Sequence, residues 1–199
     1  MAGRWWQPGR AFRTSRLSPR RDAVPAARLS RSQVVTAIVT SAYNAKIRGL
    51  LDEVYDPELP GLTIADLGVL RGVSTDNGQV AITLTPTYSG CPATQVIEMQ
   101  VRDVLLRAGL QDFRIDTELA PAWSSEWITE RGRAKLRELG IAPPVGRRGD
   151  ASDYCDPEVE CPRCGASNTE KISEFGSTAC KAHYRCRACL EPFDYFKCI

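Results

Sequence analysis

The sequence contains a single histidine, His183, among its 199 residues, and it lacks several motifs that carry catalytic chemistry. A cysteine–histidine hydrolytic pair would require His183 to reach across from the C-terminal end of the chain. No phosphate-cradling glycine loop, flavin fingerprint or di-iron set of carboxylates and histidines is present. These absences argue against a cysteine protease, an acyl-transferase and a di-iron oxygenase.

The chain also lacks long apolar runs. No segment approaches the roughly 20 apolar residues that a membrane span needs, and the N-terminus has no continuous apolar stretch of the kind found in secretory signals. We therefore expect a cytoplasmic protein with no membrane partner.

Charge is distributed unevenly. Residues 1–31 contain eight arginines and one acid, Asp22, so residues 32–199 carry a formal charge of −5. An acidic folded part is a poor match for a phosphate backbone, and we expect no nucleic-acid partner. Residues 1–31 are interpreted as a disordered basic tail, with an over-long gene start or an organelle transit peptide as the alternatives.

Apolar periodicity and turn signals predict an α+β domain over residues 32–142. Asp76-Asn77-Gly78, between two β-rich runs, is typical of a hairpin loop. The predicted order is α-β-β-α-β-α around a small mixed sheet. The elements are a helix that is strongest over 43–54, strands 69–75 and 79–85, a helix over 92–108, a strand over 112–119 and a helix from 124 to about 139.

The C-terminal part is rich in cysteine. Residues 143–160 are interpreted as a linker, and residues 161–199 hold two Cys-x-x-Cys pairs, Cys161 with Cys164 and Cys186 with Cys189. Each pair forms a turn that directs two thiolates to one point, and four thiolates leave no open position on a tetrahedral metal. We predict a structural zinc ribbon. Iron, alone or in an iron–sulfur cluster, uses the same ligands and stays an alternative, whereas disulfides do not suit a reducing compartment.

Three further residues near the ribbon are candidate auxiliary ligands. Cys180 is expected to pack as a small apolar residue and Cys198 to lie in a terminal strand over 193–198. The alternative is that both exchange with the four ligands during metal or cluster transfer. His183, three residues before Cys186, could replace a thiolate, although the complete cysteine set favours a surface or partly packed histidine.

A loop in the α+β domain carries one more candidate, Cys91. The segment Thr85-Pro-Thr-Tyr-Ser-Gly-Cys91-Pro92 places Cys91 at a helix N-terminus, where free amides and the helix dipole lower the pKa of a thiol. Cys91 is therefore either a reactive cysteine or a buried loop cysteine. The nearby carboxylates Asp56, Glu58 and Asp66 are either acids of a site or turn and cap residues.

These motifs resemble a known family. Asp56-Pro-Glu58-Leu-Pro, Ile64-Ala-Asp66-Leu-Gly68 and the Cys91 loop resemble the domain shared by SufT-like and cytosolic iron–sulfur assembly proteins. Together with the segment from Trp123 to Pro144 and the cysteine-rich tail, residues 43–199 resemble the PaaD/PaaJ family, an accessory component of phenylacetate-CoA oxygenase, also called 1,2-phenylacetyl-CoA epoxidase. His183 stands where an apolar residue is expected in that family.

The resemblance implies an accessory, non-catalytic subunit in phenylacetate catabolism. It implies that the chain helps to assemble or insert the iron–sulfur cluster of the flavin-containing reductase subunit, with Cys91, Asp56 and Glu58 as cluster-transfer residues and a transient iron–sulfur cluster as cargo. The implied partners are the reductase and oxygenase subunits, and a homodimer is left open. The alternatives are electron transfer through iron in the four-cysteine site, or a nucleic-acid-binding ribbon. Against the last, residues 155–199 hold six Lys/Arg and seven Asp/Glu.

Overall fold

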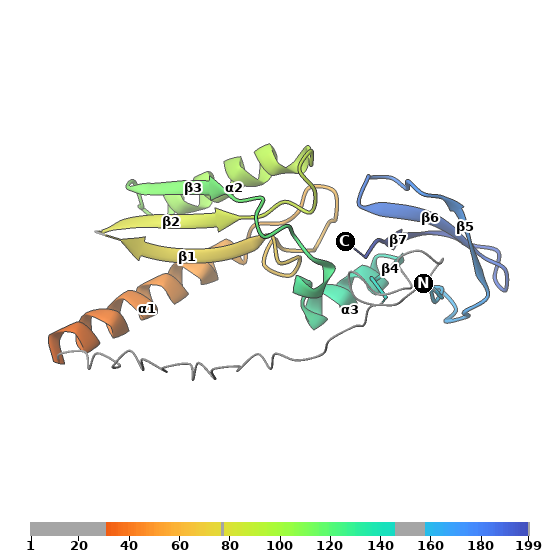
Figure 1. The fold of residues 1–199 in the computed structure, drawn as a ribbon, viewed down its shortest axis with the longest axis horizontal. Coiled ribbons are helices and arrows are strands. Elements are labelled where there is room, and N and C mark those ends of the chain that lie inside the picture. The colour runs from red at the N-terminus through yellow and green to blue at the C-terminus, as the bar shows by residue number, and fades with distance from the viewer. Residues whose placement is uncertain (1–30, 77, 146–157, 199) are drawn as a thin grey trace, which may run out of the picture.

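The structure is a computed structural model, and it describes residues 31–76, 78–145 and 158–198. The predicted tail 1–31 lies almost entirely outside these residues, and so does most of the predicted linker. The described residues form a three-stranded and a four-stranded sheet, arranged side by side along the long axis of the molecule (Figure 1). None of the described helices is long and apolar enough to cross a membrane.

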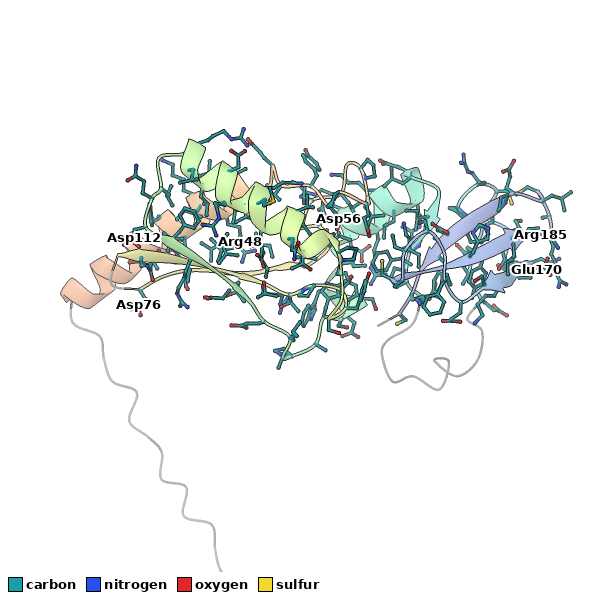
Figure 2. All side chains as sticks on the ribbon, turned by 90° about the horizontal axis from the view of Figure 1, so that it is seen from above. Arg48, Asp56, Asp76, Asp112, Glu170 and Arg185 are labelled. Carbon is teal, nitrogen blue, oxygen red and sulfur yellow. The ribbon has the colours of Figure 1, made fainter. Side chains whose placement is uncertain are left out.

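The first part is an α+β unit with the predicted order of elements. Its sheet has the order β1-β2-β3, in which β1 and β2 are antiparallel and β2 and β3 are parallel. Helices α1 and α2 lie on the same face of this sheet (Figures 1 and 2). The mixed α+β fold is confirmed. The elements are α1 (Arg31–Leu51), β1 (Leu70–Asp76), β2 (Gln79–Leu84), α2 (Ala93–Arg107) and β3 (Phe113–Thr117).

The single helix predicted from residue 124 to about 139 is wrong in one respect, because two elements occupy this segment. A 3-10 turn, η1 (Ser125–Trp127), is capped by the Ser124 hydroxyl, and α3 (Glu130–Glu138) begins after Thr129. The Thr129 hydroxyl accepts a hydrogen bond from the Gly132 amide at 3.0 Å, so α3 has its own N-cap. The extended backbone between the two caps breaks the helix.

The second sheet contains the cysteine-rich segment and has the order β4-β7-β6-β5. Its first strand is contributed by residues that follow α3 directly, and this strand runs parallel to β7. β7 ends at Phe196, because its partner β6 begins opposite it, at Lys181. The prediction that the terminal strand includes Cys198 is therefore wrong. The strands are β4 (Ile141–Ala142), β5 (Thr169–Ser173), β6 (Lys181–Cys186) and β7 (Pro192–Phe196).

The two sheets are joined by a shared apolar core. Two residues of the ribbon, Cys180 just before β6 and Phe196 at the end of β7, belong to the hydrophobic cluster of the α+β unit rather than to that of the ribbon. The Phe196 ring packs against Trp123, whose indole N–H donates to the Leu67 carbonyl at 3.0 Å. The ribbon is therefore anchored to the α+β unit by side chains from one end of its sheet.

Candidate functional site

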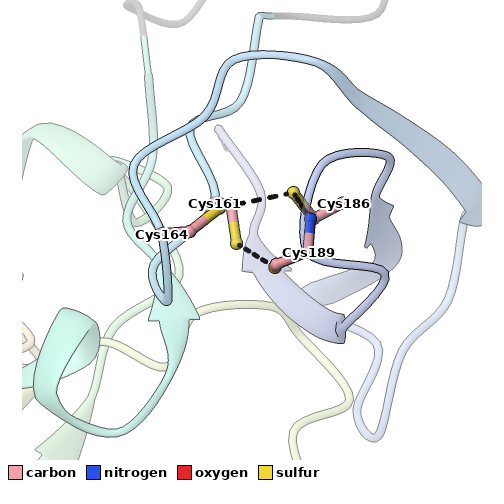
Figure 3. Close-up of side chains that lie close together, drawn as sticks. All are labelled: Cys161, Cys164, Cys186 and Cys189. Atoms are coloured by element: carbon pink, nitrogen blue, oxygen red, sulfur yellow. Dashed lines mark hydrogen bonds between the residues drawn. The ribbon is translucent and has the colours of Figure 1, made fainter.

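The four ribbon cysteines converge on one point, as Figure 3 shows. Their sulfur atoms all lie within 4.8 Å of one another. The Cys161 and Cys189 sulfurs are 3.8 Å apart, and those of Cys164 and Cys186 are 3.5 Å apart. Cys186 ends β6, and Cys189 lies in the turn that leads to β7. The two Cys-x-x-Cys turns thus face each other, as the spacing predicts.

This arrangement fits a tetrahedral thiolate metal. Zn–S bonds of about 2.3 Å at tetrahedral angles place sulfurs about 3.8 Å apart, close to the distances observed. The amides of Ala188 and Cys189 point at the Cys186 sulfur, each at 3.4 Å. The hydrogen bond from Cys189 is the main cause that lowers the pKa of Cys186 to about 6, which favours the thiolate that a metal requires.

Cys91 lies in the loop before α2. Its side chain is half-buried and packs against the hydrophobic cluster of the α+β unit. Beside it is a cavity of about 10 Å³, lined by Asp56, Val69, Leu84, Pro86, Thr87, Cys91, Thr94 and Ile97. A cavity of this size holds about one water molecule. Cys91 is therefore a thiol in the wall of a small and mostly apolar cavity.

The environment of Cys91 raises its pKa, contrary to the expectation from its position at a helix start. Burial is the largest cause, and the charges of Glu58 and Asp56 raise the pKa further. Hydrogen bonds from the Ala93 amide and from Thr87 act in the opposite direction but are outweighed. Cys91 is consequently a protonated thiol at neutral pH. A cation bound beside it would offset the effect of the two carboxylates on its pKa.

Asp56 and Glu58 lie together in a tight turn. The Asp56 carboxylate accepts a hydrogen bond from the Glu58 amide at 2.8 Å, so it stabilises the turn. Asp56 is buried, and burial raises its pKa. The turn lies at the end of the α+β unit that faces the ribbon, far from Asp76 and Asp112 (Figure 2). Asp56 therefore both shapes the turn and lines the cavity beside Cys91.

Asp66 has a different role. Its fully buried carboxylate accepts hydrogen bonds from Arg131 at 2.6 Å and Lys135 at 3.3 Å. Burial acts to raise the pKa of Asp66, but the hydrogen bonds from Arg131, Lys135 and Thr63 hold it below the usual value. The Asp66 carbonyl lies so close to Gly132 that a Cβ there would be 2.7 Å from it. Asp66 thus fixes α3 against the α+β core.

The auxiliary candidates fall in separate places. Cys180 is 6% exposed, and its sulfur lies 3.0 Å from the Thr178 hydroxyl. Cys198 follows β7, with its sulfur 3.4 Å from the Ser125 hydroxyl. His183 lies outside the four-sulfur cluster, and its Nδ1 is 3.4 Å from an Asp194 carboxylate oxygen. Only Cys180 lies in the same apolar cluster that Cys91 packs against.

Sequence reasoning missed Lys181, which is 3% exposed. Its ammonium lies 3.7 Å from Asp194, and its positive charge opposes the effect of burial on the pKa of Asp56. The burial of this lysine depends on how the two sheets dock, and no local sequence pattern signals it.

Comparisons with known proteins cover both parts of the chain. Residues 44–112 match the family model of an iron–sulfur cluster assembly protein, and residues 148–197 match that of the PaaD zinc beta ribbon domain. A protein of Escherichia coli (strain K12), named as the D component of "Putative 1,2-phenylacetyl-CoA epoxidase", is 49% identical over 154 residues, which are 77% of this chain and 92% of that protein.

Two further relatives match the first part alone. The Fe-S protein maturation auxiliary factor YitW of Bacillus subtilis (strain 168) is 36% identical over 50% of this chain and 96% of its own length. The Fe-S protein maturation auxiliary factor SufT of Staphylococcus aureus (strain USA300) is 32% identical over 42% of this chain and 96% of its own length. The α+β unit thus resembles proteins that consist of little else, whereas the ribbon is an addition to it.

Proposed function

Because the chain belongs to the PaaD family of 1,2-phenylacetyl-CoA epoxidase components, we propose that it is an accessory subunit that assists iron–sulfur cluster assembly or insertion in the reductase of that complex. The observation that carries this proposal is the placement of Cys91, in a domain of the iron–sulfur assembly family, beside a cavity that also contacts the Asp56 carboxylate. Relatives of this domain are named as maturation factors, which supports the same role.

In this role Cys91 is the thiol that takes the cargo. Its raised pKa keeps the thiol protonated until iron arrives, because a metal displaces the proton of a cysteine when it binds. The carboxylates of Asp56 and Glu58, which raise the pKa of the free thiol, attract the incoming cation. The proton of Cys91 leaves to solvent as the iron–sulfur bond forms.

The ribbon has a structural part in the proposal. Four thiolates around zinc leave no position for substrate, so the metal holds the ribbon fold together. The chain performs no catalysis of its own; its partners are the reductase, and through it the oxygenase. The protein acts in the cytoplasm, a setting that suits a chain in whose described residues seven cysteines form no disulfide.

The test is the cluster content of the reductase made in cells. The reductase is produced in cells that lack this gene, and the gene is supplied as wild type, as Cys91→Ser, or omitted. We expect iron and sulfide in the purified reductase to be restored by the wild type only. Equal cluster content in all three preparations would contradict the proposed function.

A further inference from the structure

Cys180 lies away from the ribbon's metal site and is buried against the other part of the molecule. It directly precedes β6, whose last residue is the metal-site cysteine Cys186. Of the described cysteines outside the four-sulfur cluster, it is the most buried, at 6% exposed. Apart from Phe196, the other buried residues of its hydrophobic cluster come from the α+β unit, and Cys91 and Tyr88 pack against that same cluster. The ribbon therefore delivers a thiol to the domain that carries Cys91.

The charged groups of this region act on both thiols. Burial raises the pKa of Cys180, and the charges of Glu58 and Cys91 add to this effect, against the Thr178 hydrogen bond and the Lys181 charge. Glu58 also raises the pKa of Cys91. Burial raises the pKa of Tyr88, and the charges of Cys91, Cys180 and Glu58 raise it further. Two thiols and one carboxylate from three segments thus form one electrostatic neighbourhood.

We propose that Cys180 is the second thiolate of the Cys91 site, so that the ribbon and the α+β unit together hold a thiophilic metal cargo. Soft sulfur ligands select iron in clusters, zinc and similar ions over hard cations. Two protein thiolates leave the remaining coordination positions of the cargo to exchangeable ligands, which suits a cargo that must be released. Binding releases two protons, one from each thiol, and involves no electron transfer.

The proposed site differs from the ribbon site in the number of its thiolates. At the ribbon, four thiolates enclose one point, whereas Cys91 and Cys180 come from separate parts of the chain, and neither belongs to a cluster of three or more metal-ligating groups in the described residues. The four-thiolate site of the ribbon retains its metal, whereas the two-thiolate site can release its cargo. This inference rests on the proposed function for the identity of the cargo, but the existence of the two-thiol site is tested separately.

The test is a Co²⁺ titration of the full-length, zinc-loaded protein under anaerobic conditions. Zinc binds thiolate sites more tightly than Co²⁺, so the ribbon stays filled while Co²⁺ reports on a second site. Absorption from thiolate-to-cobalt charge transfer shows that sulfur is bound. The variants are Cys91→Ser, Cys180→Ser and Cys180→Ala, with Cys198→Ser as the matched control, since Cys198 is a half-buried cysteine beside Ser125.

We expect the wild type and Cys198→Ser to bind one Co²⁺ through sulfur, and Cys91→Ser and both Cys180 variants to lose about 10- to 100-fold in affinity or more. Retained zinc in the variants shows that the ribbon is still folded. Wild-type affinity for Co²⁺ in the Cys180 variants, or no Co²⁺ bound through sulfur in the wild type, would overturn the two-thiol site and leave the role of Cys91 in the reductase assay intact. Failure of that assay with the Co²⁺ site present would instead refute the proposed function.

A second measurement needs no variant. A bifunctional thiol reagent with a short bridge is added to the folded wild type, and the linked peptides are identified by mass spectrometry. A Cys91–Cys180 link supports the site, and its absence, when other cysteines are linked, contradicts it.

Discussion

The rings of Trp123 and Phe196 lie with their centroids 5.9 Å apart and their planes tilted by 49°. Both side chains are buried, at 2% and 0% exposed. Trp123 comes from the loop before η1 and Phe196 from the end of β7, so this contact joins the core of the α+β unit to the ribbon. Together with the β4–β7 pairing it makes the ribbon an integral part of the molecule.

Removing this contact should cost substantial stability. We expect Phe196→Ala to lower the free energy of unfolding by about 3–5 kcal/mol, because it leaves a cavity in the shared core. Phe175→Ala is the matched control, since Phe175 is an aromatic residue of the ribbon that is 64% exposed. Denaturant titration followed by tryptophan fluorescence measures both. Similar losses in the two variants would contradict a shared core.

The ribbon should depend on its metal. We expect the wild type to be colourless with about one zinc per chain, and Cys161→Ser to lose both the zinc and the ribbon fold, because the metal supplies the folding energy of such modules. Cys91→Ser should keep the zinc. Elemental analysis and a visible spectrum of anaerobically purified protein decide the question. Iron with thiolate absorption in the ribbon would favour electron transfer instead.

The carboxylate of Glu58 should suppress the reactivity of Cys91. Burial and the Glu58 charge both raise the pKa of Cys91, so Glu58→Gln lowers that pKa and increases the thiolate fraction at pH 8. We expect iodoacetamide to alkylate Cys91 about two- to fivefold faster in this variant, less than the tenfold that a full pKa unit would give. Mass spectrometry of the Cys91 peptide measures the rate. Glu53→Gln removes an exposed carboxylate and should leave the alkylation rate of Cys91 unchanged. An unchanged or slower rate in Glu58→Gln would refute the electrostatic account.

Asp66 should stabilise the fold in a pH-dependent way. Its pKa in the folded state is below the ordinary value of 3.8, so its ionised form contributes stability above about pH 4, and this contribution is lost as the pH falls through the folded-state pKa. We expect Asp66→Asn to lower the free energy of unfolding by about 1–3 kcal/mol at pH 7, through weakened hydrogen bonds to Arg131 and Lys135.

The difference between Asp66→Asn and the wild type should shrink below pH 4. Asp103→Asn is the control, because the Asp103–Arg107 pair has side chains 64% and 69% exposed and contributes less than about 1 kcal/mol. Urea titrations at pH 7 and pH 3.5 measure the effect. A difference that stays constant over this pH range would show that the charge of Asp66 is not its cause.

Much of the fold could be predicted from local signals. The Asp76-Asn77-Gly78 turn predicts the β1–β2 hairpin, and the spacing of the ribbon cysteines predicts that four sulfurs meet. The hairpin depends on residues that are neighbours in sequence, and the sulfur cluster depends on one metal ion that all four cysteines bind. The break between η1 and α3 could not be predicted as readily, because Ser124 and Thr129 are both good caps and only packing against Asp66 selects two elements.

The candidate site was harder to predict, because it depends on docking. The helix start at Cys91 indicates a lowered pKa, but burial and the carboxylates of the Asp56 turn reverse the sign. Those carboxylates are more than thirty residues away in sequence, and Cys180 and Lys181 approach from the ribbon. Local rules describe the helix terminus correctly, but they give the wrong direction for the pKa shift of Cys91. The larger contributions to that shift come from burial and from distant segments of the chain.

The most direct test of the account is cluster transfer between purified proteins. The chain is loaded anaerobically with an iron–sulfur cluster and mixed with cluster-free reductase in the presence of an iron chelator that removes any released iron. We predict that the reductase gains its cluster spectrum and electron-transfer activity from the wild type, and that Cys91→Ser transfers none. Equal transfer by Cys91→Ser, or transfer that the chelator abolishes, would contradict the claim that this chain hands the cluster over through Cys91.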